Sequence, residues 1–492
     1  MWTGKGRVSA LDEGASVYDE GIADMFMLSD SDIERIDADS MRILAEIGVR
    51  VDDEELRRQA VGAGAKIGRQ NDILCFPPEM VREAVDQAPA SAGFADCDGS
   101  VTVVGPGRPS TFWTGAALNY VIGNEARPIR SQDLADFARI ADSLESVFAV
   151  VGTALADVPP PARDVVGLRI MATHTRKHLR PLLFKAENVK AMIEMAEVVA
   201  DGRPLRQCPL ISFGYSCLSP LHWSQISIDL WRNSSGHRLP VMLNGEPITG
   251  ATSPVTLAGA VALANAEVLA GVALVQLLTP ARPVVHNIGF AHSMDMRRAA
   301  CLAGSPECAL MAAAGARLAA YYKLPSASWM CTDAFADDQQ AAIEKMLTGA
   351  AHAAAGVSVI WGMGQLETEK SLSPVQLVMD DEIVRALMRF SRGFQVDDET
   401  LAYEVIRQVE SGEGEFLSHD HTIAHFRDEL SESPLLARST RQRLADGGCT
   451  TLADRAKAYV HDLLARPQEP RLTDRQSKDI LAIEQRVLKA LG

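Results

Sequence analysis

The sequence predicts an α/β protein built on a closed (β/α)8 barrel, with helical extensions at both ends of the chain. Eight short apolar runs alternate with longer helical patterns between residues 101 and 374, as expected of successive βα units. The length of this stretch suits such a barrel. No Gly-x-Gly-x-x-Gly motif follows any of the runs, which disfavours the competing open, doubly wound sheet.

The first hundred residues are expected to form a helical region. In SDSDIERIDADSMRILAEIGVRV the apolar residues recur mostly at helical spacing, and Ser29 to Ser31 offer an N-cap followed by acids. The stretch ILCFPPEMVREAVDQAP predicts a short strand and then a helix that begins at proline. The expected domains are therefore an N-terminal helical region (1–100), the barrel (101–374) and a C-terminal helical region (375–492).

The barrel strands are expected at 110–115, 147–154, 181–186, 209–216, 239–245, 283–290, 325–331 and 357–364. Helical patterns lie between them at 189–200, 220–235, 255–278, 305–322 and 338–355. After the last strand only helical patterns remain, at 375–391, 397–411, 421–429, 438–446, 450–465 and 473–490.

Composition excludes several classes of protein. The 48 Lys and Arg against 64 Asp and Glu give a net charge of −16, which argues against a nucleic-acid partner. The eight cysteines are scattered without a CxxC pair, so we expect reduced thiols in the cytoplasm. Residues 257–278 are apolar enough to suggest a membrane span, but Asn265, Glu267 and Gln276 interrupt them. We expect a buried helix and no membrane association.

Aromatic and polar side chains close the predicted strands, at the barrel end that carries active sites in this architecture. Only 5% of the chain is aromatic, yet three of its six tryptophans stand at these ends. Ring faces attract quaternary ammonium groups through cation–π interactions. Core packing explains any single aromatic residue more simply, but the set indicates a cation pocket. Its predicted lining is Trp113, Phe213, Tyr215, Trp329, Phe335 and Trp361.

Long motifs carry a family resemblance. The segments NGEPITGATSPVTLAGAVALANAEVLAG, PVVHNIGFAHSMDMRRA, TDAFADDQQAAIE and GMGQLE closely resemble the trimethylamine methyltransferase family. The resemblance extends from ILAEIGVRV to LSHDHTIAHFRDE, nearly the whole chain. It implies a (β/α)8 barrel that passes a methyl group from a methylated amine to the cobalt of a corrinoid protein.

One departure from that family changes the expected substrate. Members that act on trimethylamine carry pyrrolysine, whereas this chain has only standard residues, and Phe335 stands where related sequences commonly have lysine. Pyrrolysine-free relatives are similar to glycine betaine:corrinoid methyltransferases. A quaternary amine already holds a neutral leaving group, so its methyl transfer needs orientation and desolvation more than added activation.

The resemblance therefore implies glycine betaine as methyl donor and cobalamin, free or carried by a partner corrinoid protein, as acceptor. Carnitine, choline or proline betaine are alternative donors, and a non-catalytic amine-binding protein is a second alternative, suggested by Phe335. The residues expected to orient the substrate are Asn244, Glu246, His286 and Asp333. Glu246 is equally compatible with a structural role. The partner of a betaine carboxylate stays open among His286, Lys185, Arg297 and backbone N–H groups.

No metal site is expected in this chain. His421 and His425 are one helical turn apart, with His419 nearby, but no HExxH motif is present and a structural or docking role is favoured. Cys217, Cys331 and His286 lack a clear ligand spacing. The apolar helices suggest a homo-oligomer.

Overall fold

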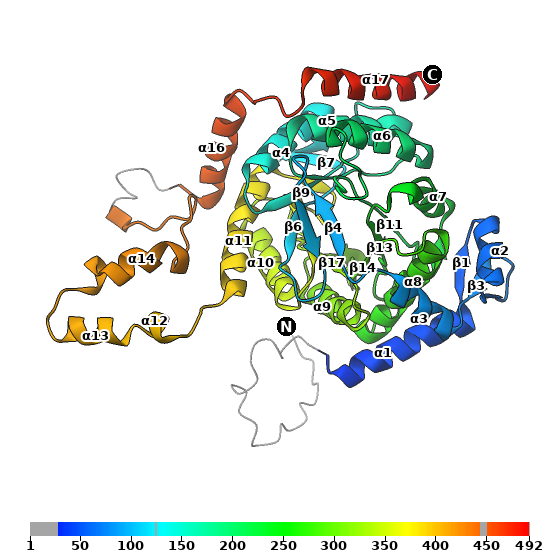
Figure 1. Ribbon diagram of the computed structural model, residues 1–492, viewed down its shortest axis with the longest axis horizontal. Coiled ribbons are helices and arrows are strands. Elements are labelled where there is room, and N and C mark those ends of the chain that lie inside the picture. The colour runs from blue at the N-terminus through cyan, green and yellow to red at the C-terminus, as the bar shows by residue number, and fades with distance from the viewer. Residues whose placement is uncertain (1–27, 124, 443–449, 492) are drawn as a thin grey trace.

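The computed structural model describes residues 28–123, 125–442 and 450–491. Its centre is a sheet of eight parallel strands in the order β10-β9-β6-β18-β17-β14-β13-β11, ringed by helices (Figure 1). A parallel bridge between Leu179 and Ile211 joins the two outer strands, so the sheet closes and the predicted (β/α)8 barrel is confirmed. In chain order the strands are β6 (Thr111–Thr114), β9 (Val147–Val151), β10 (His178–Arg180), β11 (Phe213–Ser216), β13 (Val241–Asn244), β14 (Val284–Gly289), β17 (Ser326–Trp329) and β18 (Val359–Met363).

One helix follows each barrel strand. These helices are α4 (Ser131–Ser143), α5 (Arg163–His174), α6 (Val189–Ala200), α7 (Gln225–Asn233), α8 (Leu257–Leu278), α9 (Pro306–Tyr321), α10 (Gln339–Ala354) and α11 (Pro374–Arg392). Single turns of 3-10 helix lie at Pro160–Ala162, Ala186–Asn188 and Ser235–His237. Because α11 follows β18 and packs on α10 and α4, the barrel extends beyond residue 374, its expected end.

The third barrel strand differs from its predicted position at 181–186. It is β10, and the predicted segment follows it as a loop that leads into the 3-10 turn at Ala186–Asn188. His178 and Arg180 make this strand polar, so it lacks the apolar signal on which the prediction depended. Asp164 holds the loop, because its carboxylate accepts hydrogen bonds from the N–H groups of Phe184 (3.2 Å) and Lys185 (3.1 Å).

The N-terminal region was expected to be helical, but it also contains strands. It contains α1 (Asp30–Arg42), a π-helical turn (Ile43–Ile47), α2 (Glu54–Gly62) and α3 (Pro78–Gln87). Between these helices lie β1 (Val49–Val51), β2 (Lys66–Ile67) and β3 (Ile73–Cys75), which form a small sheet with β12 (His222–Trp223). The predicted N-cap is confirmed, since Ser29 and Asp32 form a capping box at the start of α1.

Helix α8 is apolar on every side because it is covered on every side. The helices α1, α2 and α3 pack on it from outside while β13 and β14 lie inside, and 83% of its most apolar window is buried. Its polar residues have partners: Asn265 donates to Ser40 Oγ (3.0 Å) and Tyr322 Oη (2.9 Å), and Glu267 accepts from the N–H of Leu221 (2.8 Å). The helix therefore belongs to the protein core and does not span a membrane.

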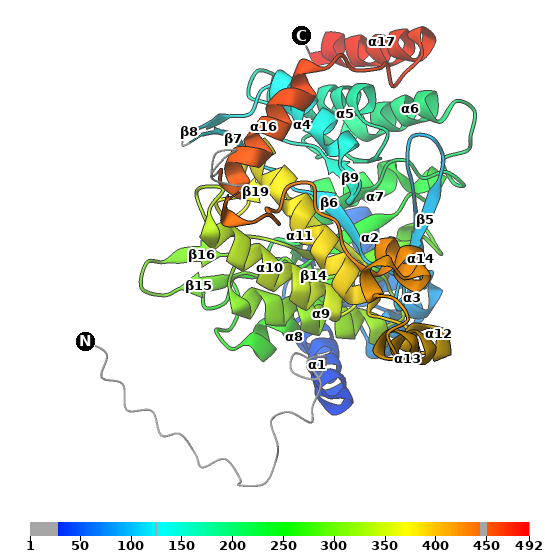
Figure 2. The same cartoon turned by 90° about the vertical axis from the view of Figure 1, so that its left-hand side faces the viewer.

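The two ends of the barrel are covered differently. The hairpin β4 (Ala92–Ala95) and β5 (Val101–Val104) lies at the amino ends of the strands, where the N–H of Ala95 donates to the carbonyl of Pro209 (3.0 Å). The carboxyl ends carry a second hairpin and a four-stranded sheet, on the left in Figure 2. Their strands are β15 (Ser293–Asp295), β16 (Ala300–Leu302), β7 (Asn119–Ile122), β8 (Glu125–Pro128), β19 (Gln365–Leu366) and β20 (Ser371–Leu372). We call this end the barrel mouth.

The described part of the C-terminal region is helical, as predicted. Helix α16 (Leu452–Ala465) packs on α11, and α17 (Asp474–Leu491) packs on α5 and α6. A separate arm projects from the barrel (Figure 1) and contains α12 (Asp398–Leu401), α13 (Tyr403–Glu410), a 3-10 turn (Phe416–Ser418) and α14 (Asp420–Glu429). The helix expected at 438–446 runs into residues 443–449, which lie outside the described residues.

Candidate active site

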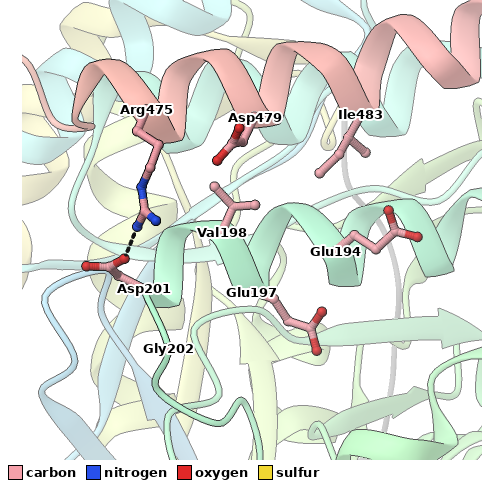
Figure 3. Close-up of a pocket in the computed structure, with 8 residues that line it drawn as sticks. All are labelled: Glu194, Glu197, Val198, Asp201, Gly202, Arg475, Asp479 and Ile483. Carbon is pink, nitrogen blue, oxygen red and sulfur yellow. Dashed lines mark hydrogen bonds and ion pairs between the residues drawn. The ribbon is translucent and has the colours of Figure 1, made fainter.

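A surface groove formed by the outer helices lies away from the barrel mouth. It runs between α6 and α17, where Arg475 pairs with Asp201 (2.5 Å) and both acidic and apolar side chains line the rest (Figure 3). These residues belong to the outer helical layer, and none comes from the end of a barrel strand. In a barrel of this kind the chemistry belongs at the carboxyl ends of the strands, so the candidate site is at the mouth.

Four aromatic rings meet inside the barrel. Trp113 and Trp361 stack with ring centroids 5.8 Å apart and planes 5° apart, and Trp329 lies 5.5 Å from Trp361. Phe290 contacts both Trp329 (4.1 Å) and Trp361 (5.4 Å). All four are buried. The structure thus brings together the three tryptophans that the sequence analysis selected, and adds Phe290; we call this group the aromatic column.

The other three predicted pocket aromatics lie elsewhere, so their placement in the pocket was wrong. Phe213 and Tyr215 pair in register with Val241 and Leu243, and both pack in the layer between the barrel wall and the helices. Phe335 is 77% exposed. Strand alternation explains the first two, because Gly214 between them faces inward.

A polar chain crosses the ends of three neighbouring strands. Asn287 donates to Asn244 Oδ1 (3.0 Å), Asn244 donates to Ser216 Oγ (3.3 Å), and Ser216 donates to Glu246 Oε1 (2.5 Å). Burial raises the pKa of Glu246 to about 7, and the charge of Glu369 adds to this effect. Asn244 and Glu246 therefore lie at the mouth as predicted, with a carboxyl group that titrates near neutral pH.

Glu369 reaches the mouth from a strained loop. Glu367, Thr368 and Glu369 are consecutive residues with φ of 55°, 52° and 72°, a region that residues other than glycine seldom adopt. Glu369 Oε1 lies 3.0 Å from Nε2 of His292. Although burial lowers the pKa of His292, the hydrogen bond and charge of Glu369 outweigh burial and raise it. Strain of this kind is held where the surrounding structure requires one geometry.

Asp333 holds that loop in place. Its carboxylate accepts hydrogen bonds from the N–H groups of Ala303 (2.8 Å) and Gly304 (3.2 Å) and from Thr368 Oγ1 (2.8 Å). These contacts fix the β15–β16 hairpin and the strained loop relative to each other. Asp333 thus positions two loops of the barrel mouth, whereas the sequence had suggested that it orients the substrate directly.

His286 does not face the mouth, contrary to the prediction. It lies in β14, but its Nε2 is 2.8 Å from Asn265 Oδ1 in α8, outside the barrel wall. Burial lowers the pKa of His286 to about 4, so the ring is neutral at physiological pH. The hydrogen bond joins β14 to α8, so we infer a structural role for His286.

The space left between these side chains is small. The void beside Phe290, His292, Trp329 and Glu369 has a volume of about 10 Å3, which is room for one water molecule. A trimethylammonium group therefore enters only if the side chains around Trp329 or the loop at Glu369 move apart.

The cations proposed for a substrate carboxylate are not in the barrel interior. Arg297 is exposed on the β15–β16 hairpin, and Lys185 lines a groove between α6 and α17. Sequence reasoning missed Arg180, which is 4% exposed and places its guanidinium carbon 5.3 Å from the ring centroid of Trp361. Alternation along β10 was the available signal, because His178 also faces the aromatic column.

The histidines of the C-terminal arm form a separate group. Ligand atoms of Glu399, His421 and His425 lie within 4.8 Å of one another. Figure 2 shows the arm at the opposite end of the molecule from the mouth loops. Cys217 and Cys331 are buried, and burial raises the pKa of both thiols, which leaves them as neutral packing groups.

Comparison with known proteins agrees with this geometry. The family described as trimethylamine methyltransferase (MTTB) matches residues 5–489. Trimethylamine methyltransferase MttB of Desulfitobacterium hafniense (strain DSM 10664 / DCB-2) is 31% identical over 440 residues, covering 87% of each chain. Glycine betaine methyltransferase of Desulfitobacterium hafniense (strain Y51) is 29% identical over 453 residues, covering 91% of this chain and 94% of that protein.

The barrel also has a counterpart among solved structures. The crystal structure of the Methanosarcina barkeri monomethylamine methyltransferase (MtmB) superposes with a TM-score of 0.54 at 12% identity, covering 89% of this chain and 88% of that one. At this identity the likeness speaks for the fold alone. The match over nearly the full length and the two relatives show that the chain belongs to the trimethylamine methyltransferase family and is a methyltransferase.

Proposed function

We propose that the protein transfers a methyl group from a quaternary amine, with glycine betaine as the preferred donor, to the Co(I) centre of a corrinoid. The observation that carries the proposal is the void that Phe290 and Trp329 of the aromatic column share with Glu369. Glu246 interacts electrostatically with Glu369 and His292, so a second carboxyl group lies nearby. Ring faces and nearby carboxylates together favour a permanent cation that offers no hydrogen-bond donor. The similarity to a glycine betaine methyltransferase supports the same donor.

The transfer balances without an added proton or oxidant. The carbon–nitrogen bond breaks and its electron pair stays on nitrogen, so the leaving group is a neutral tertiary amine. The corrinoid, held by a partner protein or free in solution, supplies the nucleophilic electron pair for the new cobalt–carbon bond. The protein contributes orientation and desolvation, which are worth most inside an enclosed apolar site.

A direct assay tests this function. Reduced cobalamin, the purified protein and glycine betaine should yield methylated cobalamin and dimethylglycine, followed by absorbance and mass spectrometry. A panel with carnitine, choline and proline betaine ranks the alternative donors. Absence of transfer from every quaternary amine contradicts the proposal. Betaine binding by calorimetry without transfer would instead favour a non-catalytic binding protein, although the exposed Phe335 gives that alternative no structural support.

We expect the KM for the quaternary amine to depend on pH through Glu246. Its carboxyl group has a pKa of about 7, so it is neutral below that pH and ionised above it, and only the ionised form attracts the ammonium group. KM should rise as pH falls below 7, by up to about tenfold per pH unit. His292 faces Glu369 and loses its charge as pH rises, which acts in the same direction.

The E246Q variant separates the two contributions. It should show a raised KM at pH 8 and a flatter pH profile, leaving only the dependence on His292. An unchanged profile in E246Q would show that Glu246 does not face the bound cation.

We also propose that the protein associates with itself and acts in the cytoplasm, where its seven described cysteines, all free, stay reduced. Helix α8 is internal and offers no surface for association, contrary to the reasoning from its apolar sequence. The arm does offer one, because its helices bury no residue within the chain. Its exposed large apolar side chains include Phe394, Leu401, Tyr403, Leu417 and Ile423. Light scattering of the purified protein tests this: a monomer would contradict it.

A further inference from the structure

Arg180 is a cation in the barrel interior that has no acidic partner among the residues that the structure describes. It is 4% exposed. Two of its nitrogens donate to the carbonyls of Pro181 and Gly214, and its Nε has no hydrogen-bond partner among the described residues. Burial lowers the pKa of Arg180 to about 9, and no neighbouring carboxylate counteracts this. A buried charge without a counter-ion costs several kcal/mol, so the position needs a reason.

A second buried arginine shows what a structural role looks like in the same protein. Arg282 is fully buried, and its three nitrogens donate to the carbonyls of Leu239 (2.9 Å) and Trp231 (2.9 Å) and to Ser234 Oγ (2.8 Å). All of these partners lie in loops and helix ends of the outer layer. Arg282 thus uses every nitrogen to hold the fold together, whereas Arg180 leaves one unused.

The guanidinium group that carries this unused nitrogen lies next to the aromatic column. The guanidinium carbon of Arg180 is 5.3 Å from the ring centroid of Trp361, and Trp361 Nε1 is also buried without a hydrogen-bond partner among the described residues. Trp329, beside the proposed ammonium position, is 5.5 Å from the same indole. Arg180 and Trp329 are therefore both neighbours of the Trp361 indole, close enough for one small zwitterion to contact both.

We propose that Arg180 binds the carboxylate of the methyl donor, and that the substrates are accordingly betaines rather than quaternary amines without a carboxylate. The inference rests on the proposed function and narrows its substrate class. Guanidinium and carboxylate groups match in a two-point, charge-assisted hydrogen bond. The carboxylate would satisfy the free Nε and supply the missing counter-charge, while the ammonium group lies against Trp329 and Phe290.

The R180Q variant tests the proposal against two donors with the same trimethylammonium group. For glycine betaine we expect KM to rise about 100-fold with kcat changed only a few-fold, because one end of a buried charge pair is lost. For choline, which has no carboxylate, KM should stay within about threefold. The R180K variant keeps the charge and should fall between R180Q and the unchanged protein for betaine.

R282Q is the matched control, since it also removes a buried arginine. It should lower the melting temperature without changing the ratio of betaine to choline KM values. An equal effect of R180Q on both donors, or none on betaine, overturns the assignment while leaving the methyltransferase function intact. A preference of the unchanged protein for choline does the same.

A measurement on the unchanged protein covers the case in which R180Q does not fold. Calorimetry with glycine betaine and its methyl ester compares an ionised with a neutral carboxyl group on the same ammonium. We expect the ester to bind about 100-fold more weakly, and equal binding would overturn the role of Arg180. Binding of neither compound, together with no methyl transfer, would reject the proposed function itself and with it this inference.

Discussion

Replacing Trp329 by alanine should lower kcat/KM for the quaternary amine by about 30-fold or more. A desolvated cation–π contact is worth about 2 kcal/mol or more, and Trp329 is the indole that lines the void at the mouth. Its Nε1 donates to Gln365, which in turn donates to the carbonyl of Ala116, so the ring is held in one orientation. W329F keeps a ring face and should retain more of the activity.

Truncating a buried tryptophan also destabilises a protein, by about 3–5 kcal/mol, so the experiment needs a control of equal bulk. Trp231 is fully buried in α7 and packs on Trp223 (4.9 Å), outside the barrel. W231A should lower the melting temperature as W329A does, but leave the kcat/KM of the folded protein unchanged. If both variants lose activity alike, the loss reports stability and Trp329 does not contact the substrate.

The architecture could be predicted because local patterns of apolar residues mark most of its strands and helices. Each barrel strand except β10 coincides with an apolar run, and the helix predicted at 189–200 matches α6 residue for residue. The failure at β10 has the same origin, since inward-facing His178 and Arg180 remove the apolar signal that marks a buried strand. The pattern therefore detects strands whose side chains pack in an apolar core, and it misses a strand whose inward-facing side chains are polar.

The site could be predicted only in part, because position at a strand end does not fix direction. In β14, Val285 packs inside the barrel, so alternation turns Asn287 inward and His286 outward; parity along the strand would have separated the two. The same alternation excludes Phe213 and Tyr215 from the barrel interior, because Gly214 between them faces inward. Glu369 and His292 are a different case, because a loop has no periodicity and their contact joins residues 77 positions apart in the chain.

Replacing Lys345 by methionine should cause a large loss of stability, about 3–5 kcal/mol in the free energy of unfolding. Lys345 Nζ and Asp380 Oδ2 are 2.7 Å apart and both side chains are fully buried. Asp380 also accepts from the N–H of Gly364 (2.7 Å), and Lys345 donates to the carbonyl of Gly362 (2.8 Å). Removing the ammonium group leaves a buried carboxylate without its counter-charge. The free-energy cost of that lone charge exceeds the stabilisation that the ion pair provides.

The double variant K345M/D380L identifies the cause. Replacing both ions by apolar side chains of similar size should restore most of the stability in urea-induced unfolding. If K345M instead acted through a packing defect, D380L would lower the free energy of unfolding further. The surface pair of Arg298 and Asp295 is the comparison, and R298M should leave the free energy of unfolding nearly unchanged because solvent screens the pair.

The same variant links stability to the active site. Gly362 and Gly364, which the buried pair holds, have φ of 104° and 82°, a region open mainly to glycine. They flank the end of β18 and thereby set the directions of Trp361 and of Gln365, the hydrogen-bond partner of Trp329. K345M should therefore raise the KM for the quaternary amine even in the fraction that remains folded, and K345M/D380L should regain stability without regaining the full affinity. Recovery of both together would show that the ion pair serves stability alone.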